Sequence, residues 1–144
     1  MHFNDNLARE VIMKSYISPE NKDNLENKQN IITKFSTTCA DKLQYVFEVQ
    51  NNVIKNLNFD AQGCAIFLAS TDILFSTIKN KSVEQALEII DIYNNFVDNN
   101  DSITQEQLQK IGNLWVFFNV KKHLNRLVCA RLSSNSLKDE LSKK

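Results

Sequence analysis

The apolar pattern of this 144-residue chain changes its period between residues 59 and 64, and that change constrains the fold most. Over residues 43–49, apolar side chains alternate with polar ones apart from Val46, which is the pattern of a half-buried strand. A second alternating stretch, 53–59, follows Asn51 and Asn52, which suit a two-residue hairpin turn because asparagine tolerates positive φ. From Cys64 onward the apolar residues recur at helical spacing. The chain therefore predicts a small sheet followed by helices.

The remaining segments can be assigned in the same way. A short apolar run at 31–36 predicts a first strand, so residues 31–60 should form a three-stranded antiparallel meander. Ser82 and Thr104 each begin a capping-box pattern, which starts a helix. We expect helices over residues 5–17, 64–80, 82–97, 104–111 and 121–141, and a short one at 114–118 packed under the sheet.

The expected fold class is α+β, with a three-stranded antiparallel sheet covered by helices. A length of 144 residues suits one domain with a real core, and we assign residues 1–144 to a single domain. Within it, residues 18–30 are polar and predict a loop after Pro19, which ends the first helix.

Composition excludes several classes of protein. The formal net charge is zero and the pI is about 6.7, whereas a nucleic-acid-binding protein usually shows a basic excess. No apolar run approaches the roughly 20 residues that span a bilayer, and the first residues lack the pattern of a signal peptide. We therefore expect a cytoplasmic protein that binds neither nucleic acid nor membrane. Three cysteines, an odd number, argue against a disulfide framework.

The cysteines are the candidate chemical groups. Cys39 and Asp41 lie in the first turn of the predicted meander, and Cys64 begins the next helix, so the antiparallel strands should bring them to the same end of the sheet. Gly63 would let the backbone pass closely there, and the helix N-terminus would favour a thiolate at Cys64. Thiolates and carboxylates are zinc ligands. The alternative reading is that each cysteine is a small buried apolar residue and that Asp41 is a turn or N-cap residue.

Three motifs in this chain resemble those of the U-type iron–sulfur assembly proteins, the IscU/NifU-like family. Thr38-Cys39-Ala40-Asp41 is similar to the family's Cys-Gly-Asp motif, and the residues from Phe59 to Ile66 are similar to the second cysteine motif. The third motif, an Arg-x-x-Cys before the last helix, is matched by Arg126 and Cys129. The segment from Leu7 to Asn21 is similar to the family's opening helix, so the resemblance covers nearly the whole chain and implies a SufE/IscU-like fold.

Within this family the chain is similar to the SufU branch. The IscU branch carries a histidine just before its last cysteine, where this chain has Val128. The SufU branch also has a longer stretch between the second and third cysteines, and we identify residues 98–113 as that insertion. The resemblance implies a zinc site formed by Cys39, Asp41, Cys64 and Cys129.

The resemblance also implies a function. A SufU-type protein accepts persulfide sulfur from a pyridoxal-phosphate-dependent cysteine desulfurase (SufS/NifS-like), activates that enzyme in a sulfurtransferase-like manner, and supports iron–sulfur cluster assembly through a downstream scaffold or recipient protein. Cys39 would be the movable sulfur acceptor, and Asp41 the hard ligand that tunes the site. Cys64 and Cys129 would be the anchors, and Arg126 a partner contact beside the site.

Two alternatives stay open at this point. The same cysteines could hold iron or a [2Fe–2S] cluster, in which case the protein would be a scaffold on which a cluster is assembled and handed on. The protein could also be a structural zinc protein that serves only as an interaction module. Ala40 and Ala61 replace glycines of the family pattern, but no ligand is missing. His123 matches no ligand of the family.

Overall fold

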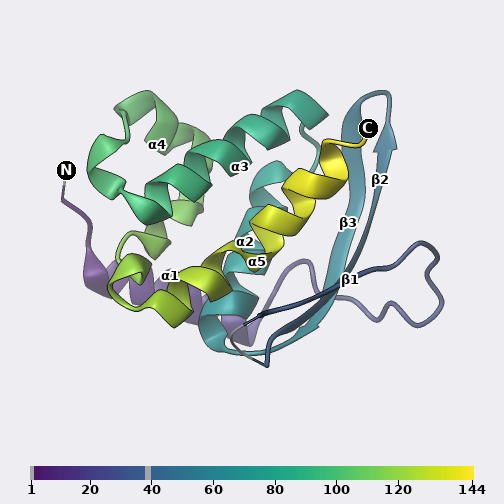
Figure 1. Cartoon of the computed structure of the whole chain (residues 1–144), viewed down its shortest axis with the longest axis horizontal. Coiled ribbons are helices and arrows are strands. Elements are labelled where there is room, and N and C mark those ends of the chain that lie inside the picture. Colours follow the sequence, from purple (N-terminus) through teal and green to yellow (C-terminus); the bar gives the residue numbers. More distant parts are fainter. Residues whose placement is uncertain (1, 38–39) are drawn as a thin grey trace.

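The computed structural model describes residues 2–37 and 40–144, so Met1, Thr38 and Cys39 lie outside the described residues. Helices, strands and 3-10 helices (η) follow one another as shown in Figure 1: α1 (Asp5–Ile17), β1 (Ile32–Phe35), β2 (Lys42–Gln50), β3 (Val53–Gln62), α2 (Ala65–Ile78), α3 (Val83–Asp98), η1 (Asn100–Ser102), α4 (Gln105–Ile111), η2 (Gly112–Phe117), η3 (Val120–Lys122) and α5 (Leu124–Leu141). No helix in the described ranges is long and apolar enough to cross a membrane.

The three strands form one antiparallel sheet in the order β1-β2-β3, which confirms the expected meander and the α+β class. The β2–β3 hairpin turns at Asn51 and Asn52, whose φ values are +52° and +65°. Two successive left-handed residues are what a type I′ turn requires, and its twist matches that of the strands. Asparagine therefore takes the place that glycine usually holds in such turns.

A β-bulge interrupts β3 at Asn56, and the sequence pattern did not reveal it. Asn56 has a φ of +54°, and the register with β2 shifts between Val46 and Glu48. An extra residue on one strand reverses the alternation beyond it. As a result Ile54, which is fully buried, joins Leu57 on the core face. The alternation expected over residues 53–59 is therefore interrupted at the bulge.

The outer edge of β3 is covered by two other segments. The Phe59 N–H donates to the Asn21 carbonyl at 3.0 Å, and the Asp23 N–H donates to the Phe59 carbonyl at 2.9 Å. Farther along the strand, Ile54 pairs with the loop between α2 and α3, donating its N–H to the Lys81 carbonyl at 2.9 Å. The polar segment 18–30 contains no regular helix or strand, but it is fixed to the sheet.

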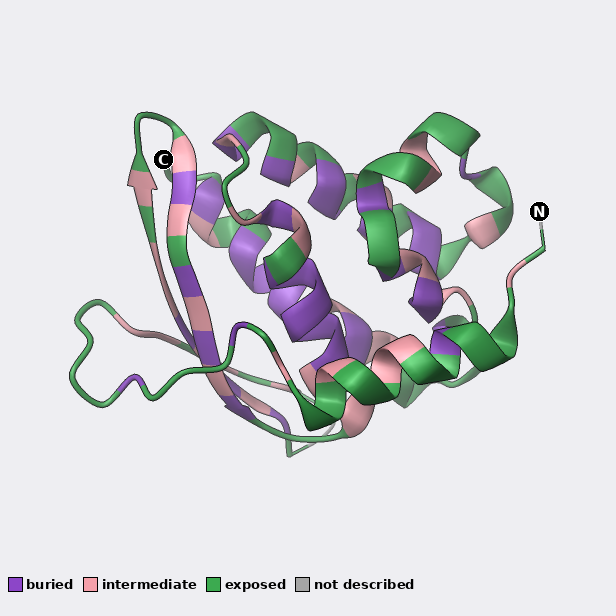
Figure 2. Ribbon diagram, turned by 180° about the vertical axis from the view of Figure 1, so that it is seen from behind, coloured by how far each residue is buried: buried purple, intermediate pink, exposed green. Residues whose placement is uncertain are grey.

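The core lies between the sheet and the helices, with α2 at its centre. Figure 2 shows α2 almost entirely buried, and it packs against α1, α5 and β3. The 3-10 helix η2 packs against α1, α2 and α4. Residues 114–118 therefore do not pack under the sheet as expected, because α2 and α5 occupy that face and leave η2 to close the far side of α2.

Candidate metal centre

Three of the four residues expected to bind metal lie together, although they come from distant parts of the chain. Asp41 directly precedes β2, Cys64 precedes α2, and Cys129 lies in the second turn of α5. The carboxylate and thiol atoms of these residues all lie within 4.8 Å of one another. The fourth expected residue, Cys39, lies outside the described residues.

The carboxylate of Asp41 is held by one oxygen and presents the other. Asp41 is only 3% exposed. Its Oδ1 accepts a hydrogen bond from the Cys64 N–H at 3.2 Å. Its Oδ2 is buried and has no hydrogen-bond partner among the residues that the structure describes. A buried carboxylate oxygen without a partner is costly, and a bound cation would satisfy it.

Cys64 is the N-cap of α2, as the sequence predicted to within a residue. Its Sγ accepts a hydrogen bond from the Phe67 N–H at 3.4 Å. The first turn of α2 contains no acidic residue, so the thiol of Cys64 and the carboxylate of Asp41 are the acidic groups at this helix end. The unpaired N–H groups and the helix dipole favour negative charge there. The Cys64 side chain is exposed, which leaves the site open to solvent.

Gly63 allows Asp41 to approach the start of α2. A Cβ built on Gly63 would lie 2.3 Å from Asp41 Oδ1 and 2.6 Å from Phe67 Cδ2. Non-bonded heavy atoms do not approach so closely, so any side chain here would displace the carboxylate. The backbone therefore passes closely at Gly63, as expected, and the group that lies against it is the Asp41 side chain.

Cys129 is buried within α5, with 3% of its surface exposed, and hydrogen bonds hold the helix at this point. Tyr93 on α3 donates its hydroxyl to the Ala130 carbonyl at 2.7 Å. Thr71 on α2 shares a hydrogen bond with Ser133, one turn further along α5. These bonds join α5 to α3 and α2 at positions just after the cysteine, so its position is set by the packed core.

The donor set fits a zinc ion. Thiolates are soft donors and a carboxylate is a hard one, and zinc, a borderline ion, binds both; a tetrahedral site needs one more ligand. Sulfur atoms on a common zinc lie about 3.8 Å apart when each Zn–S bond is about 2.3 Å. Because the atoms are already within 4.8 Å of one another, a shift of about an ångström would suffice to bind the ion.

The other candidate residues lie outside this cluster. Arg126 is exposed on α5, although it lies only three residues before the buried Cys129. His123 is exposed and makes no side-chain capping bond at the start of α5. Neither histidine belongs to the metal-ligating cluster found among the described residues. Trp115 stacks with Phe3 and Phe118 and packs, partly buried, against the core.

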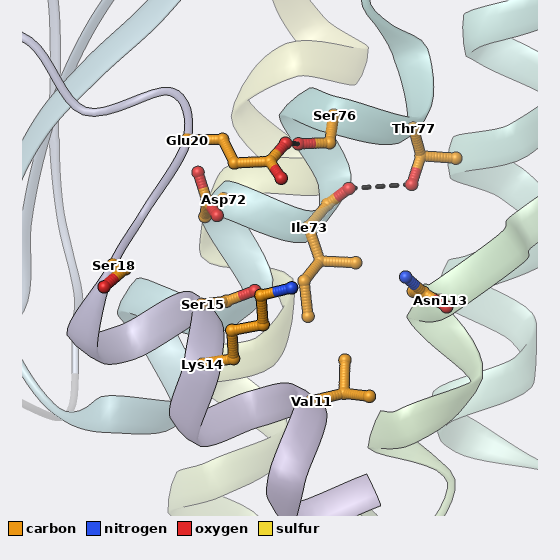
Figure 3. A pocket seen from close by; sticks show the side chains of 10 residues that line it. All are labelled: Val11, Lys14, Ser15, Ser18, Glu20, Asp72, Ile73, Ser76, Thr77 and Asn113. Atoms are coloured by element: carbon orange, nitrogen blue, oxygen red, sulfur yellow. Dashed lines mark hydrogen bonds between the residues drawn. The ribbon is translucent and has the colours of Figure 1, made fainter.

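A hollow of about 310 Å³, separate from the ligand cluster, lies between α1 and α2 and is lined by no cysteine (Figure 3). Its polar groups hold the fold together. Asp72 accepts hydrogen bonds at 2.8 Å from the Asn21 N–H and at 2.9 Å from the Asn21 side chain. Ser76 donates to Glu20 at 3.2 Å. These bonds fix the segment after α1 to α2, so the polar residues of the hollow have a structural role.

Sequence reasoning missed one feature beside the cluster. Arg131, two residues after Cys129, donates from Nη1 to both carboxylate oxygens of Asp98, at 2.9 and 3.1 Å. Its Nε is buried and has no hydrogen-bond partner within the described part of the chain. No local signal in the sequence pointed from Arg131 to Asp98, which lies 33 positions away.

Comparisons with known proteins agree with this fold and this cluster. The family model "NifU-like N terminal domain" matches residues 7–130. The zinc-dependent sulfurtransferase SufU of Bacillus subtilis is 30% identical, with 99% of this chain and 97% of that protein covered. The iron–sulfur cluster assembly scaffold protein IscU of Streptococcus pyogenes is 27% identical over 74% of this chain and 65% of that protein.

Solved structures share the fold. The crystal structure of a putative iron–sulfur cluster assembly scaffold protein for the SUF system from Fervidobacterium islandicum superposes with a TM-score of 0.80. It is 24% identical and covers 92% of this chain and 94% of its own. A hypothetical protein solved at 2.3 Å gives a TM-score of 0.83 at 22% identity, with coverage of 96% and 99%.

Proposed function

The chain belongs to the NifU-like N-terminal domain family, and on that premise we propose that it is a zinc-dependent sulfur acceptor in iron–sulfur cluster assembly. The SufU relative that matches over 99% of the chain is named a zinc-dependent sulfurtransferase. The observation that carries the proposal is the cluster of Asp41, Cys64 and Cys129, whose ligand atoms lie within 4.8 Å of one another.

The proposed zinc ligands are Cys39, Asp41, Cys64 and Cys129. Bound zinc would keep the thiols deprotonated at neutral pH, while a thiolate on the metal is a weaker nucleophile than a free one. Asp41 presents Oδ2 to the ion because Oδ1 is occupied by the Cys64 N–H. Cys129 is fixed by the packed helix α5, and Cys64 by the start of α2, so both suit the role of anchors.

Cys39 is the proposed acceptor. It is the one cysteine of the chain that the sequence places in a loop between two strands. The Cys39 thiolate would attack the terminal sulfur of the donor's persulfide. A new S–S bond forms at Cys39, the S–S bond of the donor breaks, and the donor cysteine leaves as a thiolate. The donor is a pyridoxal-phosphate-dependent cysteine desulfurase, and the sulfur would pass to a downstream iron–sulfur scaffold or recipient.

Arg126 is the proposed partner contact. Its side chain is exposed one turn before Cys129, and no ion pair holds it among the described residues. An exposed guanidinium near the ligand cluster is placed to meet a carboxylate of the partner.

We also propose that residues 1–144 form one domain of this family and that residues 98–113 are a SufU-type insertion. That segment forms η1 and α4. The match to SufU extends over 97% of that relative, whereas the match to IscU of Streptococcus pyogenes covers 65%.

One experiment separates the proposed functions. The purified protein is assayed for metal and then mixed with the cysteine desulfurase from its own genome and with cysteine. We expect near-stoichiometric zinc, faster desulfurase turnover, and the mass of one added sulfur on the peptide that contains Cys39. Cys39→Ala should abolish the stimulation, while Cys39→Ser, which keeps an oxygen in place of the sulfur, should also fail to carry persulfide.

A scaffold for a [2Fe–2S] cluster is the second candidate function, because an IscU scaffold protein is among the relatives. Iron with a visible chromophore in the purified protein, in place of zinc, would favour it. Zinc without persulfide on Cys39 and without stimulation would instead leave a structural zinc module.

A further inference from the structure

The sheet has one open edge, and it is the edge beside the proposed metal centre. The outer edge of β3 is paired with residues 21–23 and with the α2–α3 loop. The outer edge of β1 has no backbone partner among the described residues. An unpaired edge strand presents a row of N–H and C=O groups to which another extended chain can bind.

The register identifies which backbone groups face outward. The Ser36 N–H donates to the Asp41 carbonyl at 3.0 Å. In an antiparallel ladder, bonded residues alternate with unbonded ones, so Lys34 and Ile32 bond with β2 in the same way. The N–H and C=O groups of Thr33 and Phe35 therefore point away from β2, and both residues are exposed.

A groove of about 330 Å³ runs between the end of this strand and α5. On the strand side it is lined by Phe35, Ser36 and Thr37. On the helix side, one face of α5 lines it, with residues at helical spacing: Leu127, Val128, Arg131, Leu132 and Asn135. The sheet is only three strands wide, so it leaves this face of α5 half-covered. A fourth strand beside β1 would lay its alternate side chains against that face.

The groove has an apolar floor that is open to solvent. Phe35 is 65% exposed, which is high for a side chain of its size. Leu127, Val128 and Leu132 are only partly buried. An apolar patch of this kind, bordered by polar residues, is typical of an interaction site.

The charge around the groove is positive. No acidic residue is among the described residues that line the groove, whereas Arg131 lines it and Arg126 directly precedes the lining residue Leu127. Arg131 is paired with Asp98, whereas Arg126 is exposed on α5 and has no ion pair within the described part of the chain. On the strand side, Lys42 lies over the Phe35 ring at 5.9 Å. A complementary partner would be acidic.

We propose that an extended, acidic segment of the sulfur donor adds to the open edge of β1 as a fourth strand and places an apolar side chain in the groove. This inference rests on the proposed function, because it names how the desulfurase binds. Phe35 lies four residues before Cys39 in the chain, so a strand docked here brings the donor to the acceptor loop. The backbone pairing fixes the direction of approach, and the groove and the basic residues select the segment.

Two variants test the proposal against a matched control. Phe35→Glu places a negative charge in the groove. Thr33→Pro removes an outward N–H without removing a bond to β2. Ile17→Glu is the control, because Ile17 is 69% exposed on α1 and does not line the groove. We expect both test variants to raise the concentration for half-maximal desulfurase stimulation by about tenfold or more, as loss of an anchor side chain does. Maximal turnover and zinc content should stay unchanged, and the control should behave as wild type.

Amide hydrogen exchange tests the backbone pairing itself. Adding the desulfurase to the zinc-loaded protein should slow exchange of the Thr33 and Phe35 N–H groups by about tenfold or more, because they become hydrogen-bonded. If the wild-type protein stimulates the desulfurase but these amides stay unprotected and Phe35→Glu binds normally, the docking proposal is wrong while the proposed function stands. If the wild-type protein neither stimulates nor binds the desulfurase, both are wrong. Phe35→Glu keeps the test valid if Thr33→Pro fails to fold.

Discussion

Asp41 and Gly63 lie so close that the carboxylate of one occupies the space where the side chain of the other would be. The Oδ1 of Asp41 would be 2.3 Å from a Cβ on Gly63. That oxygen accepts the Cys64 N–H, and the second oxygen is buried without a hydrogen-bond partner within the described ranges. Because Gly63 has no side chain, the carboxylate of Asp41, 22 residues earlier in the chain, can take the orientation in which Oδ2 is left for a metal.

Gly63→Ala should therefore weaken metal binding without removing a ligand. The added methyl group displaces the Asp41 carboxylate, and we expect zinc affinity to fall by about 10- to 100-fold, as for other changes that disturb the orientation of a ligand. The clash with Phe67 should also lower the free energy of unfolding by about 1–3 kcal/mol. Competition with a chelator of known affinity measures the first effect, and urea denaturation the second.

Gly112→Ala is the control for this experiment. Gly112 has a φ of +52°, which an alanine adopts with strain, but an added Cβ would have no atom within 4 Å. Its stability should fall by about 1–2 kcal/mol while zinc affinity stays at the wild-type value. Equal zinc affinity in Gly63→Ala and Gly112→Ala would show that Gly63 does not position Asp41.

Asp41→Asn should reduce the stabilisation that zinc provides. The amide keeps an acceptor for the Cys64 N–H but replaces the charged oxygen that faces the cysteines. A metal at about 1,000 times its Kd stabilises the folded state by about 4 kcal/mol, so a tenfold weaker site loses about 1.4 kcal/mol of this. Chelator should accordingly lower the Tm of the zinc-loaded variant less than that of the wild type.

Asp72→Asn provides the matched control, because Asp72 is also buried but binds Asn21. It should lower stability with and without chelator by the same amount. If Asp41→Asn responds to the chelator as Asp72→Asn does, Asp41 is not a metal ligand.

Local signals in the sequence were sufficient for the helix starts and for the hairpin. Ser82 and Gln85 form both bonds of the predicted capping box, and so do Thr104 and Gln107. The Asn51-Asn52 turn follows from residues that tolerate positive φ. Each of these features depends on groups at most a few positions apart in the chain.

Features that depend on distant contacts could not be predicted in this way. Asn56 does not differ in type from the asparagines of the turn, yet it forms a bulge because both halves of β3 must bury apolar residues. The sequence predicts Asn21 to lie in a polar loop, but its backbone bonds to Phe59 and its side chain to Asp72. At the site, the meander placed Asp41 near Cys64, whereas only the family resemblance pointed to Cys129.

The ion pair between Asp98 and Arg131 should stabilise the end of α3 against α5. Because the Arg131 side chain is 29% exposed and that of Asp98 is 49% exposed, solvent screens part of the attraction. We expect Asp98→Ala to cost about 1–2 kcal/mol, since it leaves a partly buried guanidinium unpaired. Urea denaturation at low and high salt should show a smaller cost at high salt.

Asp91→Ala is the comparison for this pair. The Asp91–Lys138 pair at 2.8 Å also joins α3 to α5, but both side chains are about half exposed. An exposed pair contributes at most about 1 kcal/mol. Equal costs in Asp91→Ala and Asp98→Ala would mean that burial of Arg131 contributes nothing to the pair.

Tyr45 and Tyr93 should make the protein unstable in alkali. Burial raises the pKa of both phenols well above the ordinary value of about 10. The folded state therefore keeps protons that the unfolded state loses, so this stability is complete below about pH 10 and falls as the pH rises further. Each tyrosine contributes a slope of about 1.4 kcal/mol per pH unit in that range. Tyr45→Phe should reduce the slope by that amount, and urea denaturation between pH 9 and about pH 11.5 measures it.

Ser136→Ala separates this ionisation from loss of a hydrogen bond. The Tyr45 hydroxyl and Ser136 Oγ are 2.8 Å apart, so either variant loses about 1 kcal/mol from the broken bond. In Ser136→Ala, however, the buried phenol remains and cannot ionise without unfolding. Its stability should be lower than that of wild type at every pH, yet it should fall with the same alkaline slope. If the stability of Tyr45→Phe falls with alkaline pH as steeply as that of the wild type, Tyr45 does not titrate on unfolding.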